Sequence, residues 1–224
     1  GEFHVTPELD VIVGGRITND KKFGSFEFGT TPATVGMVSF DYKDSQFNYL
    51  VGVNYKLAQD IMLYAKYSTA YVSGGDTAGI VFKPEKTKSA EAGIKAEWLD
   101  RKLRTNVTVW WADVKNLQSP SSANTVPSVF ALLTQGNPAA PFISTFVLDT
   151  GGRKSWGIEA DFLAAPVGGL AIGGNIGYTH LKVNNVQPAL QTAYNGTYNG
   201  RSNIPKVTGS AFVQYETQPL FGHA

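Results

Sequence analysis

The stretch Lys88–Trp98 reads Lys-Ser-Ala-Glu-Ala-Gly-Ile-Lys-Ala-Glu-Trp. Every second residue from Ala90 to Trp98 is apolar, and the residues between them are polar or glycine. Because successive side chains of an extended chain point to opposite faces, this period of two predicts a β-strand with one apolar and one polar face. After Asp100-Arg101-Lys102, a tight polar turn, the segment 103–111 repeats the alternation, so the two segments predict an antiparallel hairpin.

The same alternation recurs along the chain, whereas helical periodicity is weak throughout. The alternating segments run over about 10 to 14 residues, longer than the usual strand of about 5 to 6. The predicted strands are 9–18, 47–57, 61–71, 88–98, 103–111, 155–162, 170–179 and 206–216.

The connections between these segments alternate strictly between short and long. Short turns lie near Pro7, Gln59, Arg101, Val167 and Pro219. The long connections, rich in Gly, Pro, Ser and Asn, are 19–46, 72–85, 116–144 and 184–203. Short turns at one end and long loops at the other are typical of a transmembrane β-barrel. A strand of about 12 residues spans roughly 40 Å and, tilted by about 45°, nearly covers the hydrocarbon thickness of about 30 Å.

The expected fold class is therefore all-β: an antiparallel, up-and-down transmembrane β-barrel, of which the chain forms an incomplete wall of about nine long strands. Val35–Tyr42 has a strand-like composition, but a further spanning strand there would break the alternation of connections. We interpret this segment as one arm of a hairpin inside an extended extracellular loop. An ordinary membrane strand is the alternative.

The polar face of the predicted strands carries too many charges for dry packing, which suits a hydrated barrel lumen or a plug surface. The residues predicted to face the lumen are Glu91, Lys95, Glu97, Arg104, Asn106, Glu159 and Asp161. The aromatic residues near the strand ends match the interfacial girdles of a barrel. They are Tyr67, Tyr71, Trp98, Trp111, Trp156, Tyr178 and Tyr215.

Composition narrows the classes further. The 19 basic and 18 acidic residues give a formal net charge of +1, which argues against a nucleic-acid binder. The absence of cysteine excludes a disulfide scaffold, a thiolate metal site and a cysteine nucleophile. No run of about 18 apolar residues occurs, so no helical membrane span is expected.

Six short segments, taken in order, resemble the C-terminal barrel of TonB-dependent outer-membrane receptors. Each is weak alone, and their order and spacing carry the resemblance across most of the chain. They are Gly14-Gly15-Arg16, Leu63-Tyr64-Ala65-Lys66-Tyr67-Ser68, Pro84-Glu85 followed by Glu91-Ala92-Gly93-Ile94-Lys95, Asp113–Gln118, Gly157-Ile158-Glu159 and Asn203-Ile204-Pro205-Lys206.

The resemblance implies a location in the bacterial outer membrane and energy-dependent uptake of a scarce ligand, with a ferric siderophore as the expected cargo. The implied partners are the outer-membrane bilayer, the siderophore, and the TonB complex acting through a plug domain. Nothing in the chain resembles that plug or an energy-coupling box, and no aromatic residue ends it at Gly222-His223-Ala224. We therefore expect residues 1–224 to be part of a single barrel domain whose plug and terminal strands lie outside this chain.

Ligand capture in such a receptor would use the external loops. Chelated iron carriers are often anionic and aromatic, so cationic and aromatic loop residues are the candidates. They are Lys83, Arg153, Lys154, Tyr194, Tyr198 and Arg201.

No residue pattern supports an enzyme. Glu159 and Asp161 share one strand face, as a pair of catalytic carboxylates could, but any polar lumen strand has the same spacing. The three histidines have no ligand spacing, so neither a metal nor a cofactor is expected. Two other interpretations remain: a passive porin or small closed barrel, in which 206–216 would pair with the first residues, and a secreted β-sandwich binding module with Ala92, Ile94 and Ile158 in a dry interior.

Overall fold

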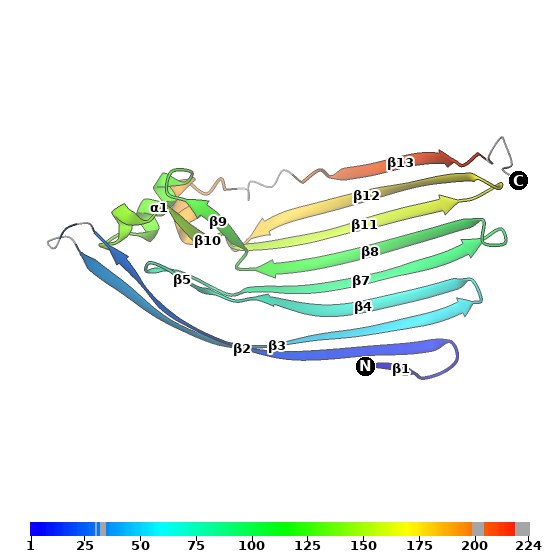
Figure 1. The fold of residues 1–224 in the computed structure, drawn as a ribbon, viewed down its shortest axis with the longest axis horizontal. Helices are drawn as coiled ribbons and strands as arrows, with labels where there is room; N and C mark the ends of the chain where they lie inside the picture. The colour runs from blue at the N-terminus through cyan, green and yellow to red at the C-terminus, as the bar shows by residue number, and fades with distance from the viewer. Residues whose placement is uncertain (30, 32–34, 199–203, 218–224) are drawn as a thin grey trace, which may run out of the picture.

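A computed structural model describes residues 1–29, 31, 35–198 and 204–217 of the chain as one curved antiparallel sheet with short elements gathered at one end (Figure 1). The sheet order is β1-β2-β3-β4-β7-β8-β11-β12-β13, so its strands follow one another in chain order. The strands of this sheet are β1 (Glu2–His4), β2 (Leu9–Phe28), β3 (Gly36–Ala58), β4 (Ile61–Val72), β7 (Glu85–Trp98), β8 (Leu103–Lys115), β11 (Gly152–Ala164), β12 (Leu170–Asn184) and β13 (Val207–Tyr215).

The eight long strands confirm the eight predicted segments, and β1, with three residues, is the ninth strand. The edge strands β1 and β13 lie on opposite sides of the sheet (Figure 1), so the small closed barrel is wrong for this chain. The sandwich is wrong as well. Ala92 is exposed and Ile158 is 43% exposed, whereas a sandwich would bury both.

The register runs without a break from β4 to β12, and it separates the side chains into two faces. Residues directly opposite each other across neighbouring strands share a face. We call one side the apolar face; one of its cross-strand rows is Val53, Ala65, Ala92, Val109, Ile158, Tyr178 and Val207. We call the other side the polar face; one of its rows is Lys95, Asn106, Asp161, Asn175 and Ser210.

Two glycines on the polar face make room for aromatic rings on the neighbouring strand. Tyr64 lies across Gly93, and its hydroxyl oxygen is 2.7 Å from Oγ1 of Thr108 on the strand beyond. A Cβ atom at Gly93 would come within 2.6 Å of the Tyr64 ring and 2.5 Å of the Val107 carbonyl oxygen. At Gly157 a Cβ would come within 2.7 Å of the Trp110 ring. The glycines therefore allow flat aromatic contact across strands where the sheet has no second layer above it.

The first long connection differs from the prediction. Residues 19–46, expected as a loop, are mostly the outer halves of β2 and β3, which stay paired from Leu9↔Tyr55 out to Phe28↔Gly36. The interpretation of Val35–Tyr42 as one hairpin arm holds for Gly36–Tyr42, but the arm continues directly into the β3 segment that pairs with β4. The alternation of polar and apolar residues continues through the hairpin. This pattern indicates strands that extend beyond the boundaries predicted for the loop.

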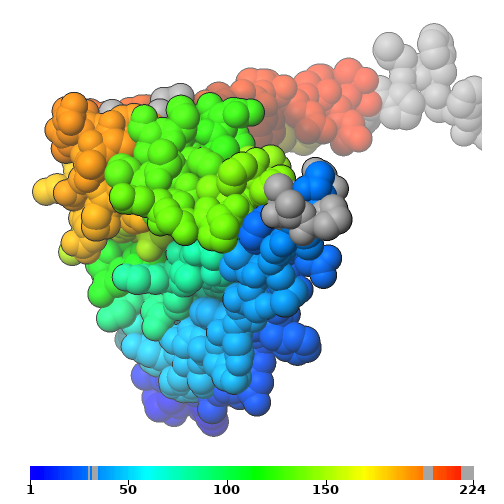
Figure 2. Space-filling view, turned by 90° about the vertical axis from the view of Figure 1, so that its left-hand side faces the viewer, coloured from blue at the N-terminus to red at the C-terminus, as the bar shows by residue number. Residues whose placement is uncertain are grey.

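The other long connections contain short elements that pack together. These elements are β5 (Gly75–Thr77), β6 (Ile80–Phe82), β9 (Gln118–Ser122), α1 (Pro127–Leu133), the 3₁₀ helix η1 (Ala140–Phe142), β10 (Thr145–Asp149) and α2 (Pro188–Ala193). We call them the loop cluster. Figure 2, viewed from this end, shows them gathered into one lobe that extends toward the β2–β3 hairpin.

The loop cluster, and not the sheet, holds the main hydrophobic core of the described residues. Its buried members are Ala78, Ile80, Val129, Ala139, Ile143, Phe146, Leu148 and Leu190. Phe26, Phe28 and Val38 pack against this core from the β2–β3 hairpin. In the register these three side chains belong to the polar face, so the cluster folds over that side of the sheet. The prediction of polar loops was incomplete. The apolar residues of these connections are scattered along the sequence and pack together only in the folded chain.

No helix in the described part of the chain is long and apolar enough to cross a membrane.

Replacing Gly93 by Ala should destabilise the sheet by about 1–3 kcal/mol, because the new methyl group would overlap both the Tyr64 ring and a backbone carbonyl. The matched control is Gly14→Ala, whose Cβ would have its nearest neighbour at 3.9 Å. Urea unfolding of the intact protein, followed by tryptophan fluorescence, measures both. Equal midpoints for the two variants would contradict the close packing at Gly93.

Candidate functional site

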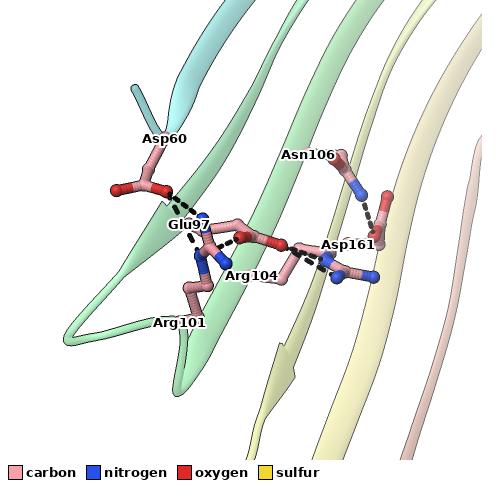
Figure 3. Close-up of polar contacts among 6 residues, drawn as sticks. All are labelled: Asp60, Glu97, Arg101, Arg104, Asn106 and Asp161. Atoms are coloured by element: carbon pink, nitrogen blue, oxygen red, sulfur yellow. Dashed lines mark hydrogen bonds and ion pairs between the residues drawn. The ribbon is translucent and has the colours of Figure 1, made fainter. Parts of the chain in front are cut away.

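The polar face carries a connected set of ion pairs at the end of the sheet with short turns (Figure 3). Glu97 accepts from Arg104, with 2.8 Å between Oε1 and Nη2, and its other oxygen lies 3.3 Å from Nε of Arg101. Arg101 also reaches Asp60 at 3.4 Å, which links the β3–β4 turn to the β7–β8 turn. The Glu97 side chain is 28% exposed and the two arginines are mostly exposed, so these contacts remain accessible to water or to another protein surface.

The predicted lumen residues all lie on this polar face, and the register explains their pairing. Asn106 of β8 donates to Asp161 of β11 at 2.7 Å; β9 and β10 separate the two strands along the chain, but they are adjacent in the sheet (Figure 3). Glu91 pairs with Lys66 at 2.8 Å, and the Lys95 ammonium lies 5.3 Å from the centre of the Tyr64 ring. Sequence periodicity placed these residues on one face, whereas their partners follow from the strand order.

A depression of about 530 Å³ lies beside the ion pairs. Its lining includes Gln59, Asp60, Lys95, Glu97, Arg101 and Arg104. Charged groups of both signs line it, and such a surface fits a polar protein segment better than a small apolar molecule.

The ligand candidates predicted for the loops do not form one site. Tyr194 and Tyr198 do come together, with ring centres 5.6 Å apart. Arg153 and Lys154, expected in a loop, lie inside β11 instead, and as neighbours on a strand they project to opposite faces. Arg153 is on the polar face and Lys154 on the apolar face, so Lys154 cannot share a lumen-side site with Arg153. Arg201 lies outside the described residues.

Lys83 is near the carboxylate of Asp149 at the end of β10. Burial raises the pKa of Asp149, while the hydrogen bond from the Gly151 N–H and the positive charge of Lys83 act in the opposite direction. Lys83 thus already has a carboxyl group as a neighbour, and its ionised form lowers the positive potential that Lys83 can offer to an anionic ligand.

A second depression, about 550 Å³ in volume, lies in the loop cluster and was not found by reasoning from sequence. Its lining is rich in hydroxyl groups: Thr77, Ser121, Ser122, Thr125 and Thr145, with Phe146 at the side. β9 and β10 pair antiparallel and place Ser122 opposite Thr145. The signal of this depression in the sequence is the Ser-Pro-Ser-Ser run at 119–122, whose residues are neither cationic nor aromatic and so were not among the predicted ligand contacts.

Two facing carboxylates anchor the base of the β2–β3 hairpin. Asp20 and Asp44 are opposite each other, and the Tyr71 hydroxyl lies 2.9 Å from the first and 3.1 Å from the second. Desolvation acts to raise the pKa of Asp44, but hydrogen bonds from Gln46, the Ser45 N–H and nearby tyrosines outweigh it and hold the pKa below its usual range. Tyr71 therefore ties the hairpin to the end of β4.

One group in the described residues has the spacing of metal ligands. Glu2, His4 and Asp10 come together because β1 pairs with β2, with their ligand atoms within 4.8 Å of one another. Histidine spacing along the chain could not reveal this contact. The group is mostly exposed, and the His4–Asp10 hydrogen bond accounts for its closeness without an ion.

Comparison with known proteins gives a consistent result. The family described as TonB dependent receptor-like, beta-barrel, matches residues 1–223. The ferric-pyoverdine 358 receptor of Pseudomonas putida is 27% identical over 134 residues, which are 58% of this chain and 16% of that protein. The ferripyoverdine receptor of Pseudomonas aeruginosa is 24% identical over 220 residues, 92% of this chain and 24% of that protein. The chain thus spans less than a quarter of the length of these relatives.

Solved structures show the same fold. The ferric yersiniabactin uptake receptor of Yersinia pestis superposes with a TM-score of 0.69 at 17% identity, covering 95% of this chain and 29% of that one. The siderophore receptor of Acinetobacter baumannii superposes with a TM-score of 0.65 at 18% identity, covering 97% and 30%.

Replacing Glu97 by Ala should lower the free energy of unfolding by less than about 1 kcal/mol, because its ion pairs are largely exposed. The control is Asp100→Ala in the adjacent turn, whose carboxylate makes no ion pair in the described part of the chain. Urea unfolding of both variants checks the difference. A loss of several kcal/mol for Glu97→Ala would show that the pairs hold the wall together.

The outer part of the β2–β3 hairpin should lose stability in acid. Because the pKa of Asp44 is lower in the folded state, its contribution is present above the unfolded pKa of about 4 and is lost as the pH falls through the lower, folded value. Hydrogen exchange of residues 18–28 and 36–46, corrected for intrinsic rates, should show protection falling below about pH 4. Asp44→Asn should be less protected at neutral pH and less sensitive to acid; an unchanged pH profile would contradict this role.

Proposed function

The chain belongs to the TonB-dependent receptor β-barrel family, and from this premise we propose that it is part of the wall of a receptor that imports a ferric siderophore. TonB-dependent receptors are outer-membrane proteins of Gram-negative bacteria, and they bind siderophores and TonB. The wall therefore belongs to the outer membrane. The two pyoverdine receptors among its relatives make a ferric siderophore the best-supported cargo.

The observation that carries this proposal is the two-faced single-layer sheet. Its apolar face leaves large side chains exposed, including Val109 at 51% and Ile176 at 60%, as contact with lipid requires. Its polar face carries ion pairs and amide hydrogen bonds, as a hydrated lumen requires. The loop cluster folds toward the polar side, where it would partly cover the mouth of a barrel.

We further propose that residues 1–224 are part of one barrel domain, and that a plug and the remaining strands complete it. An open sheet edge is not tolerated in hydrocarbon, so β1 and β13 need strand partners in the membrane. The share of the relatives' length that the chain covers agrees with this arrangement.

Within that barrel, the polar face would be the lumen wall. The charged depression beside Asp60, Glu97, Arg101 and Arg104 lies at the short-turn end, which in this orientation faces the periplasm. Its mixed charges and exposure suit contact with a plug, through which the TonB complex would act. Glu91, Lys95, Asn106, Glu159 and Asp161 would line the lumen above it.

At the opposite, extracellular end, the loop cluster would bind the siderophore. Lys83, Arg153, Tyr194, Tyr198 and Arg201 remain the cationic and aromatic candidates. The hydroxyl-lined depression beside β9 and β10 adds hydrogen-bonding groups that suit a polar chelate. Lys154 is left out, because it projects from the apolar face.

The test is iron uptake by a strain that lacks the receptor and is complemented with the intact gene under iron starvation. We expect radioactive iron supplied as ferric pyoverdine to enter only with the receptor, and uptake to stop when a protonophore removes the inner-membrane energy source. Lys83→Ala combined with Arg153→Ala should weaken binding of the chelate by about tenfold, as expected for truncation of contacts to an anionic ligand.

The matched control combines Lys56→Ala with Lys102→Ala, which removes two charges near the short turns and should leave binding unchanged. Uptake that continues without energy would support a passive porin and overturn the proposal. Failure of ferric siderophores of several chemical types to enter would overturn the assignment of the cargo.

A further inference from the structure

Five lysines project from one side of four neighbouring strands at the long-loop end of the sheet. We call them the lysine band: Lys86, Lys88, Lys115, Lys154 and Lys182. They are all exposed. In the register, Lys86 is opposite Lys115, and Lys154 is opposite Lys182. The band is therefore a surface feature assembled by strand pairing from separate segments of the chain.

The lysine band lies on the apolar face. Ala90, Trp111, Trp156 and His180 form one cross-strand row of the apolar face. Lys88, Lys154 and Lys182 each lie two residues from the row member on their own strand, and side chains two residues apart on a strand share a face. The loop cluster covers the other side at the same level. Val114 and Ser155 are buried there, while their neighbours Lys115 and Lys154 are exposed.

The charges of the band are not balanced within the described protein. Asp113 is the one acidic residue in these cross-strand rows, opposite Lys88 and Lys154, so five positive charges and one negative charge leave +4. None of the five lysines forms an ion pair in the portion of the chain that the structure describes. Like charges directly opposite each other on neighbouring strands are destabilising. The two facing lysine pairs therefore favour an anionic partner.

An apolar hollow of about 570 Å³ lies on the same face, one step closer to the middle of the sheet. Ala65, Ala90 and Ala92 contribute small side chains to it, and Tyr67, Val109 and Trp111 are also among its lining. Lys88 lies two residues before Ala90 on the same face of β7, about 7 Å along the strand. A cationic group thus lies directly above an apolar depression, which is the order of charge and hydrocarbon in an anionic lipid.

We propose that the lysine band and this hollow bind a phosphorylated lipid of the outer leaflet, with its phosphate groups on the lysines and an acyl chain against the alanines. The occupant is a lipid and not free phosphate, because the apolar hollow continues the cationic surface toward the membrane interior. The inference relies on the proposed function only for the position of the wall in the outer membrane. The binding itself is independent of iron uptake.

The experiment uses the intact receptor in nanodiscs of phosphatidylcholine, with or without bisphosphorylated lipid A, and compares it with Lys154→Gln combined with Lys182→Gln. Native mass spectrometry should show lipid A retained by the unmodified receptor and bound about fivefold more weakly for each lysine removed. In phosphatidylcholine alone the variant should be at least as stable as the unmodified receptor, because one like-charge pair is gone. In lipid A the order of thermal stability should reverse.

Three arms identify the lipid. Lys56→Gln with Lys102→Gln, which removes two charges near the short turns, should bind lipid A normally. Ala92→Leu, which fills the hollow without changing charge, should weaken retention, and dephosphorylated lipid A should bind poorly. Inorganic phosphate should not displace the bound lipid at concentrations where lipid A saturates the site.

Three results would overturn the proposal: equal lipid A retention by the Lys154/Lys182 variant, equal loss in the Lys56/Lys102 control, and displacement by inorganic phosphate alone. Replacing the same two lysines by Arg should preserve binding, which separates loss of charge from a folding defect. Because no arm measures iron, failure here leaves the uptake proposal intact, and failure of uptake leaves the lipid result readable.

Discussion

The unbroken antiparallel register is the constraint on which the rest of this structure depends. In the nine-stranded sheet, β4, β7, β8, β11 and β12 each pair with the next strand of the sheet without a shift of register, and the alternation of side chains is kept from strand to strand. A slip of one residue would exchange the two faces of a strand. It would place Glu91 and Asp161 on the apolar face and Ala92 and Ile158 on the polar face. The charge pattern and the backbone pairing therefore protect the same register.

A single-layer wall has little hydrophobic core, so its local contacts have to come from within each face. On the polar face, aromatic rings lie across glycines, as Tyr64 does at Gly93, and ion pairs join neighbouring strands. The dense apolar packing is found in the loop cluster, where Val129 and Leu190 are each 1% exposed. The connections are thus the compact part of the described chain. They hold a defined shape over the polar side of the sheet, as the proposed ligand-binding mouth requires.

Charge on the two faces has different partners and different uses. On the polar face, Glu97 and Lys66 have counter-charges inside the protein, so that face is close to balanced. On the apolar face, the lysine band has one acid among five bases and lies above an apolar hollow. The net charge of +1 conceals this division, since a sum over the chain cannot show on which side a charge lies. The two kinds of charge are separated because the side chains of neighbouring strand residues, such as Arg153 and Lys154, project to opposite faces of the sheet.

The sequence by itself determined the position and two-faced nature of the eight long strands, because the period of two is local and each strand carries it alone. The full lengths of β2 and β3, 20 and 23 residues, lie beyond what was predicted. The sequence also placed Glu97 and Asp161 on one face, and the alternation of short and long connections set their order. Tertiary structure decided what lies beside what: Asn106 against Asp161, Lys154 opposite Lys182, and the serine hydroxyls of β9 opposite β10. Those contacts join residues that are distant along the chain. They depend on register and on how the loops pack, which no local pattern encodes.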